Sequence, residues 1–133
     1  MAKANNENQN NDIIFYTTPT GNVKIEVVFN NETFWLTQKT MAELFGVKVP
    51  AISKHLTNIY SEGELPALTT ISKMETVVNR GFRGEVTDNI DFYNLDAVIA
   101  VGYRVNSYQA TQFRIWASIQ PNLIKRNEAI AIF

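Results

Sequence analysis

The sequence contains no cysteine and a single histidine, His55. Without cysteine there can be no disulfide, iron–sulfur cluster or thiolate zinc site, and one histidine cannot supply a His pair for a metal. No dense loop of Asp and Glu offers oxygen ligands for a hard cation, and no nucleophile accompanies His55 as a general base. Phosphate-binding glycine loops and catalytic triads are also missing. We therefore expect no metal, no cofactor and no enzymatic activity.

Charge of one sign and long hydrophobic runs are missing as well. Twelve Lys and Arg face thirteen Asp and Glu, a net charge of -1. A protein that coats nucleic acid or an anionic membrane through bulk charge would be far more basic, so any nucleic-acid contact must come from a local patch. No apolar run approaches the ~18 residues of a membrane span, and residues 1–11 have no apolar core of a signal peptide. We expect a cytoplasmic protein that does not enter a membrane.

The 133 residues, 45% of them hydrophobic, suffice for one core and hardly for two. Six of the first eleven residues are Asn or Gln, a composition that cannot offset the entropy of ordering. The sequence therefore predicts a disordered tail over residues 1–12, a single domain over 13–120 and an atypical or truncated tail over 121–133.

The period of the apolar residues changes along the chain. Alternation with a period of two predicts strands at 13–17, 23–29 and 33–36. A period near 3.6 then predicts one helix from the cap Thr37 to Gly46 and another from Pro50 to Ile59. A second hairpin, with strands 68–78 and 85–93, and helices near 95–105 and 108–119 follow. The predicted fold class is α+β: a small N-terminal antiparallel sheet with a helix-turn-helix, a second hairpin and two C-terminal helices.

The two helices at about 37–59 have the spacing of a helix-turn-helix unit, and the spacing resembles that of phage Cro-type repressors. Ala42 is small where the second helix would cross the first, and Gly46 suits a left-handed turn. Three lysines and one glutamate between Leu36 and Ile59 make the segment locally basic. The alternative is that the two helices are only scaffold, because glycine-joined amphipathic helices also occur in folds that never touch DNA.

On the DNA-binding interpretation, the outward face of the second helix enters the major groove. Ser53 and Lys54 would then face bases, and Gln38 would fix the register through the DNA backbone. The predicted DNA-binding residues are Gln38, Lys39, Lys48, Ser53, Lys54, Thr57 and Asn58. A weaker hypothesis is a second phosphate-binding surface made of Arg80, Arg83, Arg104 and Arg114, which are as readily read as solvated or paired with acids.

Several blocks of the chain together resemble the virulence-associated RhuM family of bacterial proteins. They are Val23–Val27, Phe34–Gln38 with Met41–Val47, Ile52–His55, Phe92–Asp96 and Val101–Ser107 with Thr111–Ala117. The resemblance spans roughly residues 13–119 and implies a DNA-binding-type protein of pathogenicity islands and mobile elements, without established enzymatic activity. The region from Tyr103 to Trp116 also looks like the N-terminal domains of phage antirepressors.

Two functions follow as expectations. The first is a DNA-binding accessory or regulatory protein of a mobile element or pathogenicity island, with double-stranded DNA as partner. The second is an antirepressor-like module that binds a repressor without reading DNA. For DNA binding we expect a homodimer, because two-fold sharing would cover the apolar residues near the C-terminus. The alternatives are that these residues cover the second hairpin, or that the tail is a truncation scar that associates non-specifically. These residues are Phe113, Trp116, Ile119, Leu123, Ile124, Ile130, Ile132 and Phe133.

Overall fold

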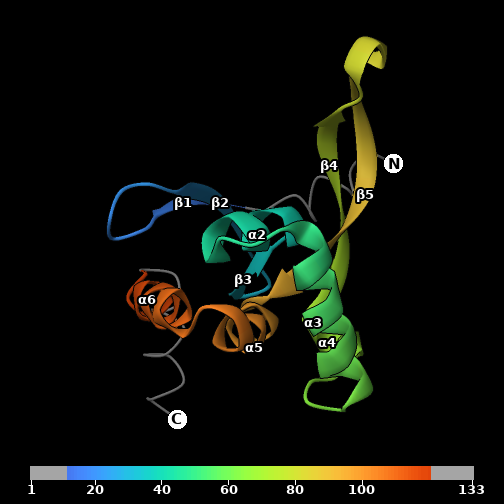
Figure 1. Ribbon diagram of the computed structural model, residues 1–133. Coiled ribbons are helices and arrows are strands. Elements are labelled where there is room, and N and C mark those ends of the chain that lie inside the picture. The colour runs from blue at the N-terminus through green and yellow to red at the C-terminus, as the bar shows by residue number, and fades with distance from the viewer. Residues whose placement is uncertain (1–11, 121–133) are drawn as a thin grey trace.

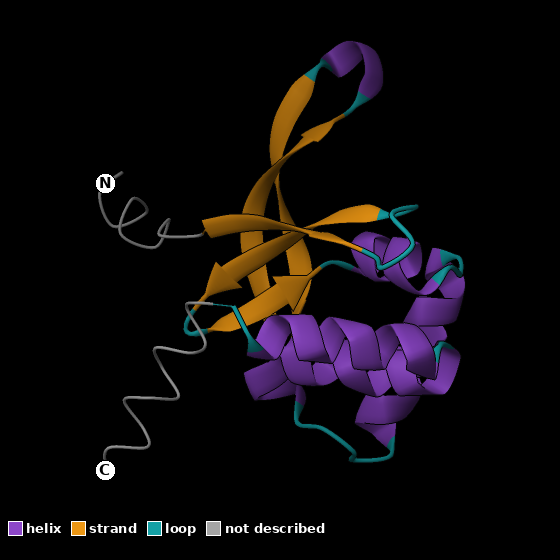
Figure 2. Ribbon diagram, turned by 90° about the vertical axis from the view of Figure 1, so that its left-hand side faces the viewer, coloured by secondary structure: helices purple, strands orange, loops and turns teal. Residues whose placement is uncertain are grey.

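The computed structural model describes residues 12–120, apart from the side chains of residues 78 and 79. The described strands form one antiparallel sheet in the order β1-β2-β3-β5-β4, and the longer helices gather on one side of it (Figures 1 and 2). The strands are β1 Asp12–Thr17, β2 Lys24–Asn30, β3 Thr33–Leu36, β4 Ile71–Asn79 and β5 Glu85–Asn94. The helices are α2 Gln38–Phe45, α3 Val49–Ser61, α4 Ala67–Thr70, α5 Leu95–Val105 and α6 Ser107–Ser118, with a 3-10 turn η1 at Gly81–Arg83. The predicted α+β class is confirmed.

The predicted tails lie outside the described residues, with one exception at the N-terminal boundary. Asp12, which we had placed in the disordered tail, begins β1 and stands opposite Phe29 of β2. The tail prediction is therefore wrong at Asp12, because a polar residue at the end of an edge strand still takes part in backbone pairing. The predicted tail over 121–133 lies beyond the described residues.

The two predicted hairpins belong to one sheet, which the sequence did not reveal. Strand β3 pairs with β5 through Trp35 opposite Asn94 and Leu36 opposite Tyr93. The predicted strand start at Leu68 is wrong, because Ala67–Thr70 forms the helical turn α4. The Thr70 hydroxyl donates to the Pro66 carbonyl at 2.7 Å, and such local bonds compete with strand pairing.

The core lies between the sheet and the helices and contains an aromatic cluster at α6. Phe113 is fully buried, and its ring centroid lies 5.1 Å from that of Tyr16 and 5.4 Å from that of Trp116. Two of the residues that we assigned to a dimer interface, Phe113 and Trp116, thus pack within this chain. Ile119 is exposed, and the other predicted interface residues lie beyond the described ones.

Gly102 lies where α5 closely approaches α6 and α2. A Cβ atom at this position would lie 2.6 Å from the Cβ of Ala110 and 2.6 Å from Cζ of Phe45. Glycine is therefore required where α5 meets both α6 and α2. This spacing holds α2, and with it the start of the candidate site, against the C-terminal helices.

Candidate nucleic-acid interface

Local hydrogen bonds fix the two ends of α2. The Thr37 hydroxyl accepts from the backbone N–H of Thr40 at 3.1 Å, and the Thr40 hydroxyl accepts from the N–H of Thr37 at 3.0 Å. At the other end Gly46 has φ 73°, and its N–H donates to the Ala42 carbonyl at 2.9 Å. The capping box and the left-handed glycine are the local signals of a helix start and stop. The predicted helix from Thr37 to Gly46 is confirmed.

The faces of α3 separate by burial. Ile52, Leu56 and Ile59 are buried against the core, whereas Ser53, Lys54 and Thr57 are exposed. At 100° per residue, these three exposed positions lie on one side of the helix. Asn58, which we predicted on the same face, is half-buried at its edge.

The basic residues near α3 are not neutralised within the described chain. Lys48 is the N-cap residue of α3, and Lys39 is the second residue of α2; both are exposed, as is Lys54. None of these lysines forms an ion pair with a described residue. The first turn of α3 holds no acidic residue, so the helix dipole and Lys48 both favour an anion at this end.

The opposite end of α3 is acidic. Glu62 and Glu64 follow the helix, and both bind Arg104 of α5, with N–O distances of 2.9 and 2.8 Å. Positive charge therefore lies at the start of α3 and acidic charge at its end. A polyanion is favoured at the N-terminal half, where Ser53 and Lys54 lie.

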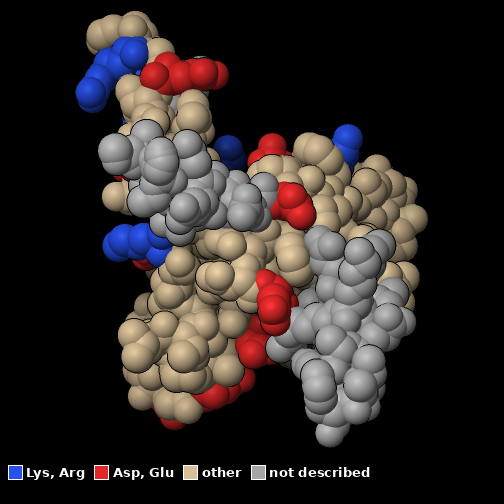
Figure 3. Space-filling model, turned by 180° about the vertical axis from the view of Figure 1, so that it is seen from behind, with Lys and Arg blue, Asp and Glu red and all other residues tan. Residues whose placement is uncertain are grey.

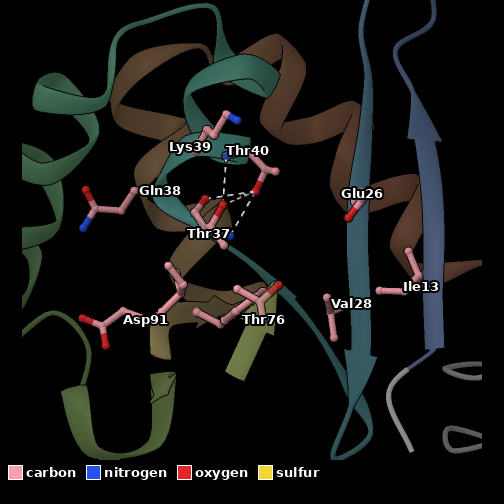
Figure 4. A pocket seen from close by; sticks show the side chains of 11 residues that line it. Ile13, Glu26, Val28, Thr37, Gln38, Lys39, Thr40, Thr76 and Asp91 are labelled. Atoms are coloured by element: carbon pink, nitrogen blue, oxygen red, sulfur yellow. Dashed lines mark hydrogen bonds between the residues drawn. The ribbon is translucent and has the colours of Figure 1, made fainter. Parts of the chain in front are cut away.

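Gln38 has a partner within the protein. Its side-chain amide donates to the hydroxyl oxygen of Tyr93 at 3.0 Å, which ties the first residue of α2 to β5. Tyr93 is buried. In Figure 4 the Gln38 side chain points away from Thr76 and Val28 across the pocket. Sequence reasoning missed this tie, because the two residues are 55 positions apart in the chain.

A pocket of about 460 Å³ lies on the side of the sheet opposite the core, beside the start of α2 (Figure 4). Val28, Ile90 and Phe92 supply apolar lining, and Thr37 to Thr40 form part of the wall. Glu26, Lys39 and Asp91 are its charged lining residues. Sequence reasoning missed the pocket because its walls come from distant strands; the apolar residues at both inward and outward positions of β2 were the available signal.

The structure does not bring the four predicted arginines of a second basic surface together. Arg80 and Arg83 lie at the tip of the β4–β5 hairpin, far from α5 and α6, which carry Arg104 and Arg114 (Figure 1). Arg80 is paired with Asp88, and Arg104 with its two glutamates. Arg114 donates to the Tyr103 hydroxyl oxygen at 3.3 Å and thereby lowers the pKa of Tyr103. Figure 3 shows basic side chains at the hairpin tip.

Residues 12–120 contain no group of three or more His, Cys, Asp or Glu side chains placed to hold a metal ion. Within the same part of the chain, every helix is too short or too polar to cross a bilayer.

A family model matches the second half of this arrangement, which holds the β4–β5 hairpin, α5 and α6. Residues 69–125 match the virulence protein RhuM family. The predicted RhuM resemblance is thereby confirmed within residues 69–125, where the chain is similar to this family. The RhuM segment begins after α3, so the α2–α3 pair lies outside the match. Comparison with curated proteins and with solved structures gives no match.

Proposed function

We propose that this RhuM-type protein binds duplex DNA through the exposed face of α3, as a non-enzymatic accessory or regulatory protein of a bacterial mobile element or pathogenicity island. The observation that carries the proposal is the arrangement of α3 itself. A buried rear holds the helix against α2 and the core, while Ser53, Lys54 and Thr57 face solvent. These side chains can donate or accept the hydrogen bonds that proteins make to base edges and to phosphate oxygens. A cytoplasmic location follows from this role.

Each residue has a role within this proposal. The N-terminal half of α3 enters the major groove, with Ser53 and Lys54 toward base edges. Lys39, Lys48 and Thr57 approach the flanking phosphates, and Asn58 lies at the edge of the contact. Gln38 keeps one amide hydrogen available to donate to a phosphate of DNA while it holds Tyr93. The acidic far end of α3, with Glu62 and Glu64, stays outside the groove.

The test is a polarization titration of labelled duplex DNA at ~50 and ~150 mM salt. With three to five phosphate contacts, a log–log salt slope of about −3 to −4 and binding at micromolar Kd or weaker are expected for unselected DNA. Lys54→Ala and Ser53→Ala should each weaken binding to a selected site by roughly 1–3 kcal/mol, whereas Lys39→Ala should weaken all sequences about equally. Arg114→Ala is the matched control, because Arg114 is exposed on α6, outside the α2–α3 pair. Unchanged affinity for all three site variants contradicts the proposal.

A second candidate is the antirepressor-like module, in which a repressor replaces DNA as the partner. The observation that favours it is on α6, where Tyr108, Ile115 and Ile119 are all exposed. Positions seven and eleven residues apart lie on one face of a helix, so these apolar side chains form one stripe. A folded protein that does not bind DNA at ~50 mM salt supports this candidate over the first.

We further propose that the working unit is a homodimer, with the same α6 stripe as its interface in place of Phe113 and Trp116. A symmetric dimer would present two copies of α3 about 34 Å apart to a near-palindromic site. Sedimentation equilibrium of the wild type and of Ile115→Asp tests this. A monomeric wild-type protein at tens of micromolar would overturn it.

A further inference from the structure

The tip of the β4–β5 hairpin presents a large apolar side chain to solvent without any cover. Phe82 has a relative exposure of 105%, the highest of the exposed large hydrophobic residues in the described chain. It lies between Arg80 and Arg83 in the 3-10 turn η1, which backbone bonds close: the N–H of Arg80 donates to the Gly84 carbonyl at 2.9 Å. A fully exposed phenylalanine contributes nothing to the buried core. Its side chain is accessible to a partner molecule.

The hairpin projects beyond the rest of the sheet as an arm. Its strands pair from Ile71 opposite Tyr93 to Asn79 opposite Glu85, but β3 pairs only with Tyr93 and Asn94 of β5. Phe92 and Ile90 still pack with Val28 and Trp35, so the projecting part of β5 runs from Ile90 to Glu85 and is roughly 17 Å long at ~3.4 Å per residue. Figures 1 and 2 both show it standing clear of the helices. An isolated two-stranded hairpin is marginally stable in water, so a partner at the tip would also stabilise the arm.

Hydrogen bonds fix the base of the arm to both helices of the proposed DNA-binding unit. The Tyr60 hydroxyl of α3 lies 2.8 Å from the Thr70 hydroxyl, one residue before β4 begins. The Gln38 amide of α2 donates to the Tyr93 hydroxyl of β5. The arm therefore has a defined position relative to α3, and a ligand held by α3 has a defined position relative to the arm.

The chemistry of the tip fits the minor groove of DNA. Arginine is the side chain that proteins place in narrow minor grooves, and phenylalanine is among the apolar wedges that enter between base steps. Arg83 is exposed and makes no ion pair with a described residue, so its charge is free to meet phosphates and groove edges. Along the strands Lys73 pairs with Asp91 and Arg80 with Asp88, which neutralises part of the acidic charge of the arm.

We infer that the β4–β5 hairpin is a second DNA-contacting element, which places Arg83 and Phe82 in the minor groove next to the major groove that α3 occupies. This inference rests on the proposed function and extends it to a surface outside α3. One helical turn is about 34 Å, so adjacent major and minor grooves lie roughly 17 Å apart along the axis. The projecting part of the arm is about as long as this separation, so its tip can reach the neighbouring groove.

The experiment compares Arg83→Ala and Phe82→Ala with wild type on a labelled duplex of about two helical turns. Matched controls are Arg114→Ala, an exposed arginine on α6, and Leu68→Ala, an apolar residue with 92% exposure at the hairpin base. Each tip variant should weaken binding by roughly fivefold to tenfold, and Arg83→Ala should lower the salt slope by about 0.9. The controls should bind within twofold of wild type. Circular dichroism confirms that each variant is folded.

Netropsin, which occupies the minor groove of A·T tracts, supplies a second measurement. On a duplex with A·T flanks, netropsin should weaken DNA binding by the wild-type protein. It should leave DNA binding by a Phe82→Ala, Arg83→Ala double variant unchanged. If wild type binds DNA but the tip variants match the controls, or if netropsin has no effect on wild type, the arm inference is overturned and the proposed role of α3 stands. If wild type does not bind duplex DNA, both are overturned. Loss of self-association without loss of DNA binding in Phe82→Ala would make the tip a protein contact and also overturn the inference.

Discussion

Substitution of Gly102 by alanine separates the effect of packing from that of helix propensity, because packing predicts a loss of stability and propensity predicts a gain. Gly102 lies in the interior of α5, where alanine is favoured over glycine by roughly 1 kcal/mol. A protein in which only propensity mattered would therefore gain stability. The geometry opposes this, since the added methyl group would lie 2.6 Å from the Cβ of Ala110 and 2.6 and 2.8 Å from ring carbons of Phe45.

The clash cannot be relieved by a simple side-chain rotation. The Cβ of Ala110 is fixed to the backbone of α6, and the Phe45 ring is 2% exposed within the core. Helix α6 or the ring must move, and overpacking of this kind typically costs about 1–3 kcal/mol. After the propensity gain of roughly 1 kcal/mol is subtracted, a net destabilisation of up to about 2 kcal/mol is expected. For a chain of this length that lowers Tm by up to about 10 °C.

Thermal melts and urea unfolding of wild type, Gly102→Ala, Ala110→Gly and the double variant measure the effect and its cause. If the Ala110 methyl group is part of the clash, the double variant should be more stable than the sum of the two single changes predicts. A Gly102→Ala protein that is more stable than wild type, as helix propensity alone predicts, would refute the close approach of α5 and α6 at this glycine.

Three further substitutions test the α2–α3 unit and the core. Gly46→Val should lower the free energy of unfolding by more than ~1 kcal/mol in a urea titration. The cause is backbone strain alone, because φ is 73° and no atom lies within 4 Å of an added Cβ. Gly46→Asn should recover part of this loss, because asparagine tolerates the left-handed conformation better. Ala42→Leu should destabilise by about 1–3 kcal/mol through overpacking at a buried position, and unchanged melts would mean that Ala42 has room. Burial, and then Tyr108, raise the pKa of Tyr16. The unfolded chain therefore loses the Tyr16 proton at lower pH than the folded protein, and the free energy of unfolding falls as pH rises through 10. Tyr16→Phe should flatten this decline in the free energy of unfolding. At pH 7 the substitution should leave the stability unchanged, because the Tyr16 hydroxyl has no hydrogen-bond partner in the described chain.

The sequence by itself determined most of the longer elements and several of their ends. Alternating apolar residues predicted β2, and a 3.6 period predicted α2, α3 and α5, because each pattern reflects which side of one element meets the core. The helix caps at Thr37, Gly46 and Asn94 were also predictable, since each depends on a backbone conformation or a hydrogen bond within a few residues. For the same reason the outward positions of Ser53, Lys54 and Thr57 followed from helical spacing alone.

Only the tertiary structure decided how these elements meet. The pairing of β3 with β5 joins two hairpins that lie far apart in sequence, and the Gln38–Tyr93 bond crosses the same distance. The burial of Phe113 and Trp116 and the need for glycine at position 102 depend on which apolar surfaces come together. The separation of Arg83 from Arg104 likewise depends on the length and direction of the hairpin arm. These features arise from contacts between distant segments, and no local pattern of residues encodes which distant surface will be the partner.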